Sequence, residues 1–551
     1  MADKVTALKL MWQSLSTGRD PWMDLWQELA EIYLPGKAHF TERRLAGERD
    51  NEEIYDSTPR RAARDLAAAI DGLIKPKTSN WFQPYVEDDD VMADFAVKRY
   101  LDVVQELMWR AIYRTESRFI QRSSEVDTNL VVHGWGVLWV AENRSKTGII
   151  FKSFHNSNVA FAENADGVID TIGVAESLTA RQAVDKYGAK NVHKKVIEAY
   201  EAKDVQAKNQ KFEFVNLVFP NTDYHGRMFK GRNKPFQSVI LDTKNDWIVD
   251  EGGFYEFPAS IPRWDTEAGG CYPRSPGMVA LPDALTLQAI SRTLLIGGER
   301  AADPPLMVPS DAFLSPVRTF PGGLSVYDVQ ALADGELRQP VFPLPTSTQL
   351  PVGREMQADY RFQVESAFYR DVMKIPEGAP TATEVLEKKE EFIRALGPIF
   401  GRLEADYIGQ TINRVFAIME RARALPEPPP QLRGLPIQFR YQSPLQQARK
   451  ALEVAGLNRT LEIAAPMLEI KPEMMDYIDS DAIMNDSPEW SGIPSRWIKT
   501  QDDIEEERAQ RAEAQEAAQN VENAKPVAES LKAVAQAQEI QANAPPDPNI
   551  L

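Results

Sequence analysis

Apolar residues between Pro380 and Pro426 recur at steps of three and four, which is the period of one face of a helix. Thr381 and Glu384 have the spacing of a capping box at its start, and Pro426 suits its end. The pattern predicts one long helical element. Its two apolar stripes are Phe392, Leu396, Ile399, Leu403 and Tyr407, then Ile408, Ile412, Val415 and Met419.

Three residues interrupt this helical pattern: Gly397, Pro398 and Gly401. Proline removes one backbone hydrogen bond, and its ring clashes with the carbonyl four residues earlier, so we expect a kink here. Two interpretations stay open. The run is either one long kinked helix that bridges two regions of a large assembly, or two separate helices.

The rest of the chain predicts an α+β protein that is mainly α. Residues 1–125 have helical spacing, whereas residues 126–260 alternate as strands do around a short helix at about 180–187. The runs 134–140 and 148–151 predict two paired strands. Helical spacing returns over about 275–302 and 353–373, on either side of a Pro- and Gly-rich stretch that predicts a small β module.

Asp88, Asp89 and Asp90 precede a predicted helix from Val91 to about Tyr113. Three adjacent carboxylates could suggest a metal ion. Favourable negative charge at a helix N-terminus is the preferred interpretation.

The composition indicates a soluble protein made in a reducing cytoplasm. The 551 residues carry 63 basic and 81 acidic side chains, a net charge of −18, and one cysteine, Cys271. This balance argues against a general nucleic-acid binder, and a lone cysteine excludes an internal disulfide. The N-terminus lacks the apolar core of a signal peptide, and the best apolar stretch, Leu130–Ala141, is too short to span a bilayer.

No sequence motif points to catalysis, a cofactor or a metal. The chain lacks a phosphate-binding G-x-x-x-x-G-K-[ST] loop and a G-x-S-x-G elbow, and its five histidines are scattered. Asp476–Asp481 resembles part of a calcium loop but lacks the required Gly and Glu, so a solvated helix end is preferred. An enzyme function therefore has no positive feature in its favour.

Several short blocks occur in a fixed order along the chain. They are Ile54–Thr58, Asp71–Pro76, Trp81-Phe82, Pro262–Trp264, Tyr272–Gly277, Asp303–Leu306, Thr381–Val385 and Ser443–Leu445. In this order they resemble the head-to-tail connecting (portal) proteins of short-tailed bacteriophages. The chain departs from the family pattern at Pro59-Arg60, Lys75 and Pro273.

The resemblance implies a portal fold with a helical stem, a small β-rich clip, an α/β wing with a long kinked helix, and a helical crown. The implied divisions are wing 1–277, first stem helix 278–302, clip 303–350, second stem helix 351–373, tunnel loop 374–380, long wing helix and spacer 381–436, crown 437–505, and an Ala-, Gln- and Glu-rich tail 506–551, helical or disordered.

The resemblance also implies a structural function without cofactor, metal or enzymatic activity. About twelve subunits would form a ring at one capsid vertex, and double-stranded DNA would pass through this ring without sequence specificity. The resemblance implies no membrane partner. The implied partners are the major capsid and scaffolding proteins, the terminase large subunit, and the tail adaptor and nozzle proteins. The protein would be made in the host bacterial cytoplasm and reside in the virion. Alternatives are another phage structural protein, such as a tail adaptor, or a packaging enzyme.

The short connector between two predicted helices would be the tunnel loop that narrows the DNA channel. A mostly acidic wall would repel the duplex and let it slide, although the charge could also serve solubility alone. The connector consists of Lys374, Ile375, Pro376, Glu377, Gly378, Ala379 and Pro380.

Overall fold

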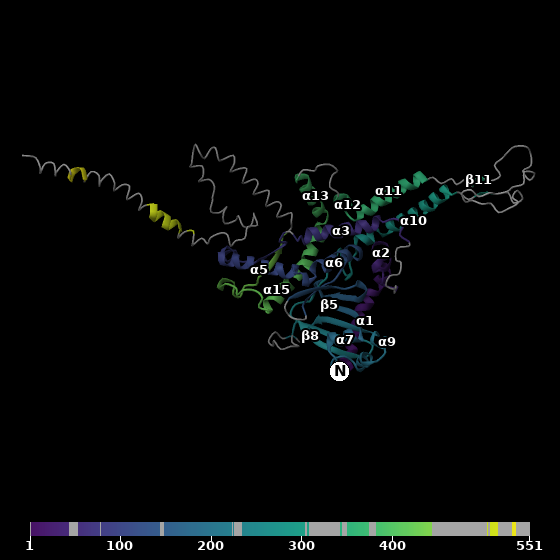
Figure 1. Ribbon diagram of the computed structural model, residues 1–551, viewed down its shortest axis with the longest axis horizontal. Coiled ribbons are helices and arrows are strands. Elements are labelled where there is room, and N and C mark those ends of the chain that lie inside the picture. The colour runs from purple at the N-terminus through teal and green to yellow at the C-terminus, as the bar shows by residue number, and fades with distance from the viewer. Residues whose placement is uncertain are drawn as a thin grey trace, which may run out of the picture. The chain divides into compact units, whose positions relative to one another are not determined.

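The computed structural model describes residues 2–42, 53–77, 79–143, 148–222, 224, 234–303, 306–307, 342–343, 350–373, 382–442, 504, 507–515 and 532–535. The chain divides into two compact units. The first comprises Met1–Gln83, Glu106–Leu425 and Phe439–Ala448, and the second comprises Pro84–Gln105, Pro426–Gln438 and Arg449–Leu551. Helices predominate beside several antiparallel sheets, which confirms the predicted class (Figure 1).

An antiparallel sheet of five strands in chain order lies in the first unit (Figure 1). Its strands are β4 (Val159–Glu163), β5 (Ile169–Thr179), β6 (Lys211–Pro220), β7 (Phe236–Asp242) and β8 (Trp247–Phe254).

Helices cover parts of both faces of this sheet. Helix α1 (Ala2–Arg19) packs Leu8 and Leu15 against Val215 and Leu217 of β6. Successive strand residues face opposite sides, so Phe214 lies on the other face, among helices that follow β5. These helices are α7 (Ala180–Tyr187), α8 (Lys194–Glu201) and α9 (Val205–Lys208).

Two of the predicted strands pair as expected: β2 (Leu138–Glu142) runs antiparallel to β3 (Ile149–Ser153). The two-residue strand β9 (Ala259–Ser260) pairs with the other edge of β2. In the predicted β module, β10 (Leu306–Met307) pairs with β11 (Phe342–Pro343). The remainder of 304–349 lies outside the described residues.

Helices α2 (Met23–Tyr33) and α6 (Phe119–His133) pack against α10 (Pro276–Ala302), and α3 (Thr58–Ile74) packs against both of them. Ser275 caps α10 by accepting from the Met278 amide at 3.0 Å, and its hydroxyl donates to the Val132 carbonyl of α6 at 2.7 Å. The beginning of α10 is therefore fixed to the helical core.

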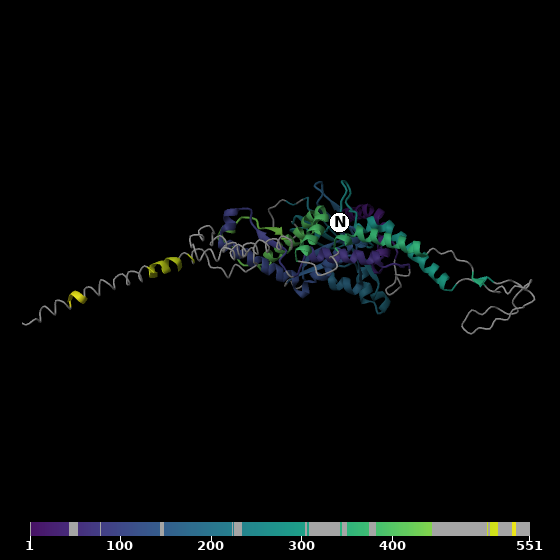
Figure 2. The same ribbon diagram turned by 90° about the horizontal axis from the view of Figure 1, so that it is seen from above.

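Helix α10 and helix α11 (Leu350–Ala367) lie side by side in both views (Figures 1 and 2). By length and composition alone, α10 could cross a membrane, but it also contacts α2, α6 and α11 as a core helix does. The second helix was predicted to reach Met373 and instead ends at Ala367. Buried Phe368 packs against Tyr33, Tyr369 adopts a φ of 56°, and the short α12 (Arg370–Met373) follows.

The long apolar run forms successive helical segments rather than one uniform α-helix. These are α13 (Ala382–Ala395), α14 (Gly397–Leu403), the π-helix η6 (Glu404–Gly409) and α15 (Gln410–Arg421).

In the second unit, Val86, Val97, Leu101 and Leu432 form a small apolar cluster. The predicted single helix from Val91 to Tyr113 is instead two helices, α4 (Asp89–Ala93) and α5 (Phe95–Tyr113). Each start has its own capping carboxylate: Asp88 accepts from the Asp90 amide at 3.1 Å, and Asp94 accepts from the Ala96 amide at 2.7 Å. Strand β1 (Phe82–Tyr85) pairs with β12 (Gln438–Tyr441) in a two-stranded sheet, and neither strand belongs to the second unit alone.

The packing of α1 on the sheet generates the first prediction. A Cβ at Gly173 of β5 would lie 2.6 Å from the Trp12 ring, so we expect Gly173→Val to lower the free energy of unfolding. Overpacking of this kind costs about 1–3 kcal/mol. Urea denaturation of the purified chain measures the change. Gly252→Val on β8 is the matched control, because a Cβ there meets no atom within 4 Å. Equal effects of the two substitutions would contradict the proposed contact.

Candidate functional site

The predicted tunnel loop, Lys374–Pro380, and the predicted capping residue Thr381 lie outside the described residues. The helices on either side are described: α12 ends at Met373 and α13 begins at Ala382. Glu384 lies in the first turn of α13 and is exposed.

The helical run is interrupted at Leu396, directly before Gly397 and Pro398. Pro398 therefore sits in the first turn of α14, where its missing N–H is tolerated. A Cβ at Gly397 or Gly401 would meet no atom within 4 Å, so close packing does not require either glycine. The position of the break is explained by proline.

A π-helical turn, Glu404–Gly409, follows α14 and shifts the helix register. Its carbonyl groups find a partner on another element, because the Ser260 hydroxyl lies 2.9 Å from the Asp406 carbonyl and 2.8 Å from the Tyr407 carbonyl. The turn places the side chains of Tyr407 and Asp406 in two separate polar groups, the first buried and the second half-buried.

Tyr407 belongs to the first of these groups, together with Lys75 and Asp127. The Lys75 ammonium donates to both Asp127 oxygens, at 2.7 and 2.6 Å, and to the Tyr407 hydroxyl at 2.9 Å. Both charged side chains are only 1% exposed. Burial raises the pKa of Asp127 to about 6, although the charge of Lys75 opposes this rise.

Asp406 belongs to the second group, which is centred on buried Arg263. The guanidinium donates to Glu163 of β4 at 2.7 Å, to the Gly167 carbonyl at 2.9 Å and to Asp406 at 3.3 Å. Helix α14 is joined to the same block of sequence, because Arg402 donates to the Trp264 carbonyl at 2.8 Å. The Pro262–Trp264 block therefore connects the five-stranded sheet to the long helical run.

Asp56, from the block Ile54–Thr58, connects three helices. Its carboxylate accepts from the Thr58 amide at the start of α3 and from Arg361 of α11, both at 2.8 Å. Gln288 of α10 accepts from the Asp56 amide and donates to the Asp56 carbonyl, also at 2.8 Å. These bonds hold α10 and α11 against the helical core.

Beyond these bonds, the α10–α11 pair leaves large apolar side chains in solvent. Single exposed apolar residues are ordinary on a soluble protein, whereas a series along two neighbouring helices indicates a surface for association. We call this series the stem surface. It consists of Val279, Leu285, Leu295 and Ile296 on α10, and Val352, Met356 and Phe362 on α11.

The family model for the bacteriophage head to tail connecting protein matches residues 5–498. The chain belongs to this family. The resemblance suggested by the ordered sequence blocks is therefore confirmed.

Two curated relatives extend this similarity over nearly the whole chain. The portal protein of Salmonella phage epsilon15 is 28% identical over 544 residues, covering 97% of this chain and 96% of the relative. The probable portal protein of Bordetella phage BPP-1 is 27% identical over 525 residues, covering 92% of this chain and 91% of the relative.

Solved structures of gene transfer agent (GTA) particles are also similar, each at 13% identity. The virion of the native particle matches with a TM-score of 0.34 over 79% of this chain and 95% of that chain. The neck of the empty particle, computed with C6 symmetry, gives 0.35 over 76% and 91%.

Three of the scattered histidines of this head-to-tail connecting protein lie near one another, which the sequence pattern did not predict. The His39 and His155 ring centroids are 6.5 Å apart, and both His133 and His155 pack against Phe40. His155 is held by the Ser157 hydroxyl at 2.7 Å and the Lys37 carbonyl at 2.9 Å. Within the described residues, no group of three or more ligating side chains could hold a metal ion.

The buried ion pair generates the second prediction. Lys75→Met would leave the Asp127 carboxylate buried and uncompensated, which costs about 3–5 kcal/mol. We expect the double variant, Lys75→Met with Asp127→Leu, to recover most of that loss, because neither charge then remains. Chemical denaturation measures both. Lys388→Met is the control, since its pair with Glu391 is on the surface and such pairs contribute about 0–1 kcal/mol. Equal losses at Lys75 and Lys388 would refute this role.

Proposed function

We propose that this head-to-tail connecting protein is a portal subunit, and that about twelve copies form a closed ring at one capsid vertex. The near full-length similarity to two portal proteins supports this function over that of a tail adaptor or a packaging enzyme. The observation that supports ring formation is the stem surface, because its apolar side chains are exposed to solvent in a single subunit.

A closed ring would cover this surface by a contact between different faces of neighbouring subunits. Burying apolar surface contributes about 25 cal/mol per Å², so seven large side chains can supply much of the association energy. In this arrangement α10 and α11 act as the stem helices. The clip would be 303–350, the tunnel loop 374–380, the crown 437–505 and the tail 506–551, with 1–277 and 381–436 in the wing.

The ring would be a passive channel for double-stranded DNA during packaging and ejection. A net charge of −18 on each subunit supports weak contact with the duplex, because few phosphates would be neutralised and DNA could slide. Lys374 would be a rare positive group near the constriction. The clip would contact the terminase large subunit and later the tail adaptor and nozzle, while the wing meets capsid and scaffolding proteins.

We assign the protein no catalytic step. It would be made in the host bacterial cytoplasm and incorporated into the virion, with packaging energy supplied by the terminase. An ATP hydrolysis assay on the pure chain separates this function from that of a packaging enzyme, because substantial turnover by the chain alone would contradict it.

The stem surface generates the third prediction. Leu295 is 54% and Phe362 is 61% exposed, so Leu295→Asp with Phe362→Asp should leave the subunit fold intact. The two charges would be buried in the ring, where each costs several kcal/mol. We expect native mass spectrometry to show rings for the parent and mainly monomers for the variant. Val205→Asp on α9 is the matched control, because Val205 is 68% exposed outside the stem surface. Intact rings in the double variant would exclude this interface.

The connector generates the fourth prediction. Deleting Glu377–Ala379 should permit rings to form, because the flanking helices keep their packing faces. It should impair retention of packaged DNA, because the constriction is widened. The measurement is the length and leakage of DNA in assembled particles. Particles that fill, hold and eject DNA like the parent would show that the connector is not the constriction.

A further inference from the structure

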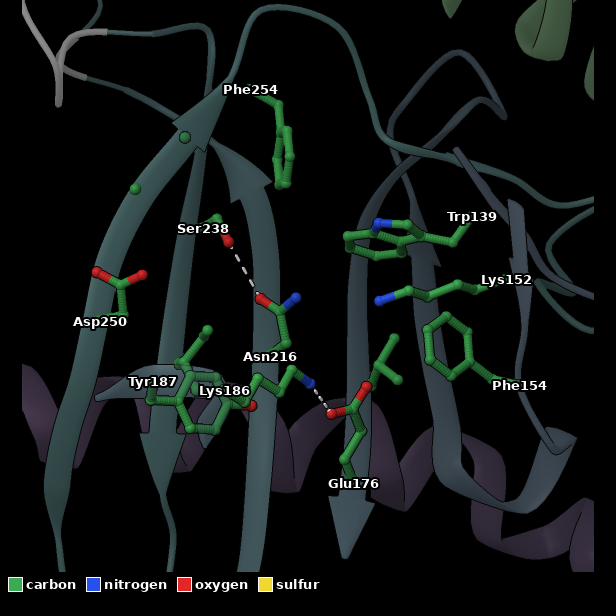
Figure 3. A pocket seen from close by; sticks show the side chains of 14 residues that line it. Trp139, Lys152, Phe154, Glu176, Lys186, Tyr187, Asn216, Ser238, Asp250 and Phe254 are labelled. Carbon is green, nitrogen blue, oxygen red and sulfur yellow. Dashed lines mark hydrogen bonds and ion pairs between the residues drawn. The ribbon is translucent and has the colours of Figure 1, made fainter. Parts of the chain in front are cut away.

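A cavity of about 320 Å³ lies on the face of the five-stranded sheet opposite α1, next to the β2–β3 pair (Figure 3). Its floor includes Asn216 of β6 and Ser238 of β7. Four aromatic side chains line it as well: Trp139, Phe154, Tyr187 and Phe254. Trp139 lies nearly perpendicular to Phe154 and to Phe254, with ring centroids 6.0 and 5.9 Å apart.

Two hydrogen-bond donors point into this cavity. The Asn216 carbonyl oxygen accepts from the Ser238 hydroxyl at 3.1 Å, which leaves its amide N–H groups directed inward (Figure 3). The Lys152 ammonium points toward the same space and makes no ion pair or hydrogen bond with any residue that the structure describes. Neither donor therefore has a protein acceptor among the described residues, and the Lys152 side chain is exposed to solvent.

The other charged groups of the cavity do not supply that acceptor. Glu176 is already paired with Lys186 of α7. Asp250 lies on β8, on the far side of Ser238 from Lys152 (Figure 3). Burial lowers the pKa of Lys152 and the neighbouring Lys186 ammonium lowers it further, while the attraction of the Glu176 carboxylate opposes both effects. An anion bound beside Lys152 would therefore add to a compensation that Glu176 supplies only in part.

We propose that this cavity binds a carboxylate joined to an apolar ring or chain. The carboxylate accepts from Lys152 and Asn216, while the apolar part packs among Trp139, Phe154 and Phe254. The Asp250 carboxylate repels a second negative group and so orients the ligand. The volume is at the lower end of the range for small-ligand pockets, roughly 300–1,000 Å³. The ligand is either a free organic acid or an acidic residue beside an aromatic residue in a protein segment.

The first experiment uses the full chain and two probes, 3-phenylpropanoate and the blocked dipeptide acetyl-Phe-Glu-amide. Lysines are acylated briefly at pH 8 and mapped by mass spectrometry. We expect a bound probe to slow acylation of Lys152 and to leave that of Lys244, outside the cavity, unchanged. Acetyl-Phe-Gln-amide is the uncharged control and should not protect. Protection by the dipeptide alone assigns a protein segment as the source, and protection by the free acid alone assigns a small metabolite.

The second experiment compares probe affinity among variants by ligand-detected NMR. Lys152→Gln should weaken binding about tenfold, the loss expected for one charge-assisted hydrogen bond. Gly252→Leu should abolish binding although every donor is still present. Gly252 lines the cavity and a Cβ there meets no atom within 4 Å, so the leucine side chain would occupy the space of the ligand. Lys244→Gln is the matched control. The proposal is overturned if neither probe protects Lys152, if the Gln dipeptide protects equally, or if Lys152→Gln binds as the parent does.

Discussion

The charge on Lys75 constrains the architecture around it, because a buried ammonium group needs a partner at close range. Two of its partners come from distant parts of the chain, Asp127 from α6 and Tyr407 from the π-helical turn, and a third, Asp71, lies four residues earlier at 3.4 Å. A buried ion pair contributes little net stability, since desolvation offsets the attraction, but it penalises every arrangement that separates its members. The pair therefore specifies how α3, α6 and the long helical run are positioned against one another.

The π-helical turn contributes to two polar groups, because its adjacent residues Asp406 and Tyr407 contact different partners. In a regular α-helix, adjacent side chains diverge by about 100°. Here Asp406 reaches Arg263 and Tyr407 reaches Lys75, while Ser260 bonds the carbonyls of both residues. Displacing this turn would break one buried and one half-buried polar group together. Helix α15 is thus fixed to the body, whereas α13 lies beyond the break at Leu396, next to the proposed tunnel loop.

Local signals in the sequence predicted some of these elements well. Helix α7 was expected at about 180–187 and occupies Ala180–Tyr187. Its start is capped by Thr179 and Gln182, which are only three residues apart in the chain. A kink was expected at Gly397, Pro398 and Gly401, and the helical run is interrupted at Leu396, directly before the first two. The sequence did not predict three other features: the distant partners of Lys75, the π-helical turn, and the end of α11 at Ala367. Each depends on packing against a residue far away in sequence, and the lining of the cavity was hidden for the same reason.

The body of the subunit buries its apolar side chains within one chain, whereas the α10–α11 pair leaves several of them exposed. The five-stranded sheet buries Val215, Leu217 and Phe214 under its own helices. Hydrogen bonds from Asp56 and Gln288 fix α10 and α11 in place, yet Leu295 and Phe362 remain in solvent. A surface that is rigidly positioned and still uncovered is suited to repeated contact between identical subunits, because each copy presents it without reorganising. Rigidity in the body is therefore what would allow a ring to close at a fixed number of subunits.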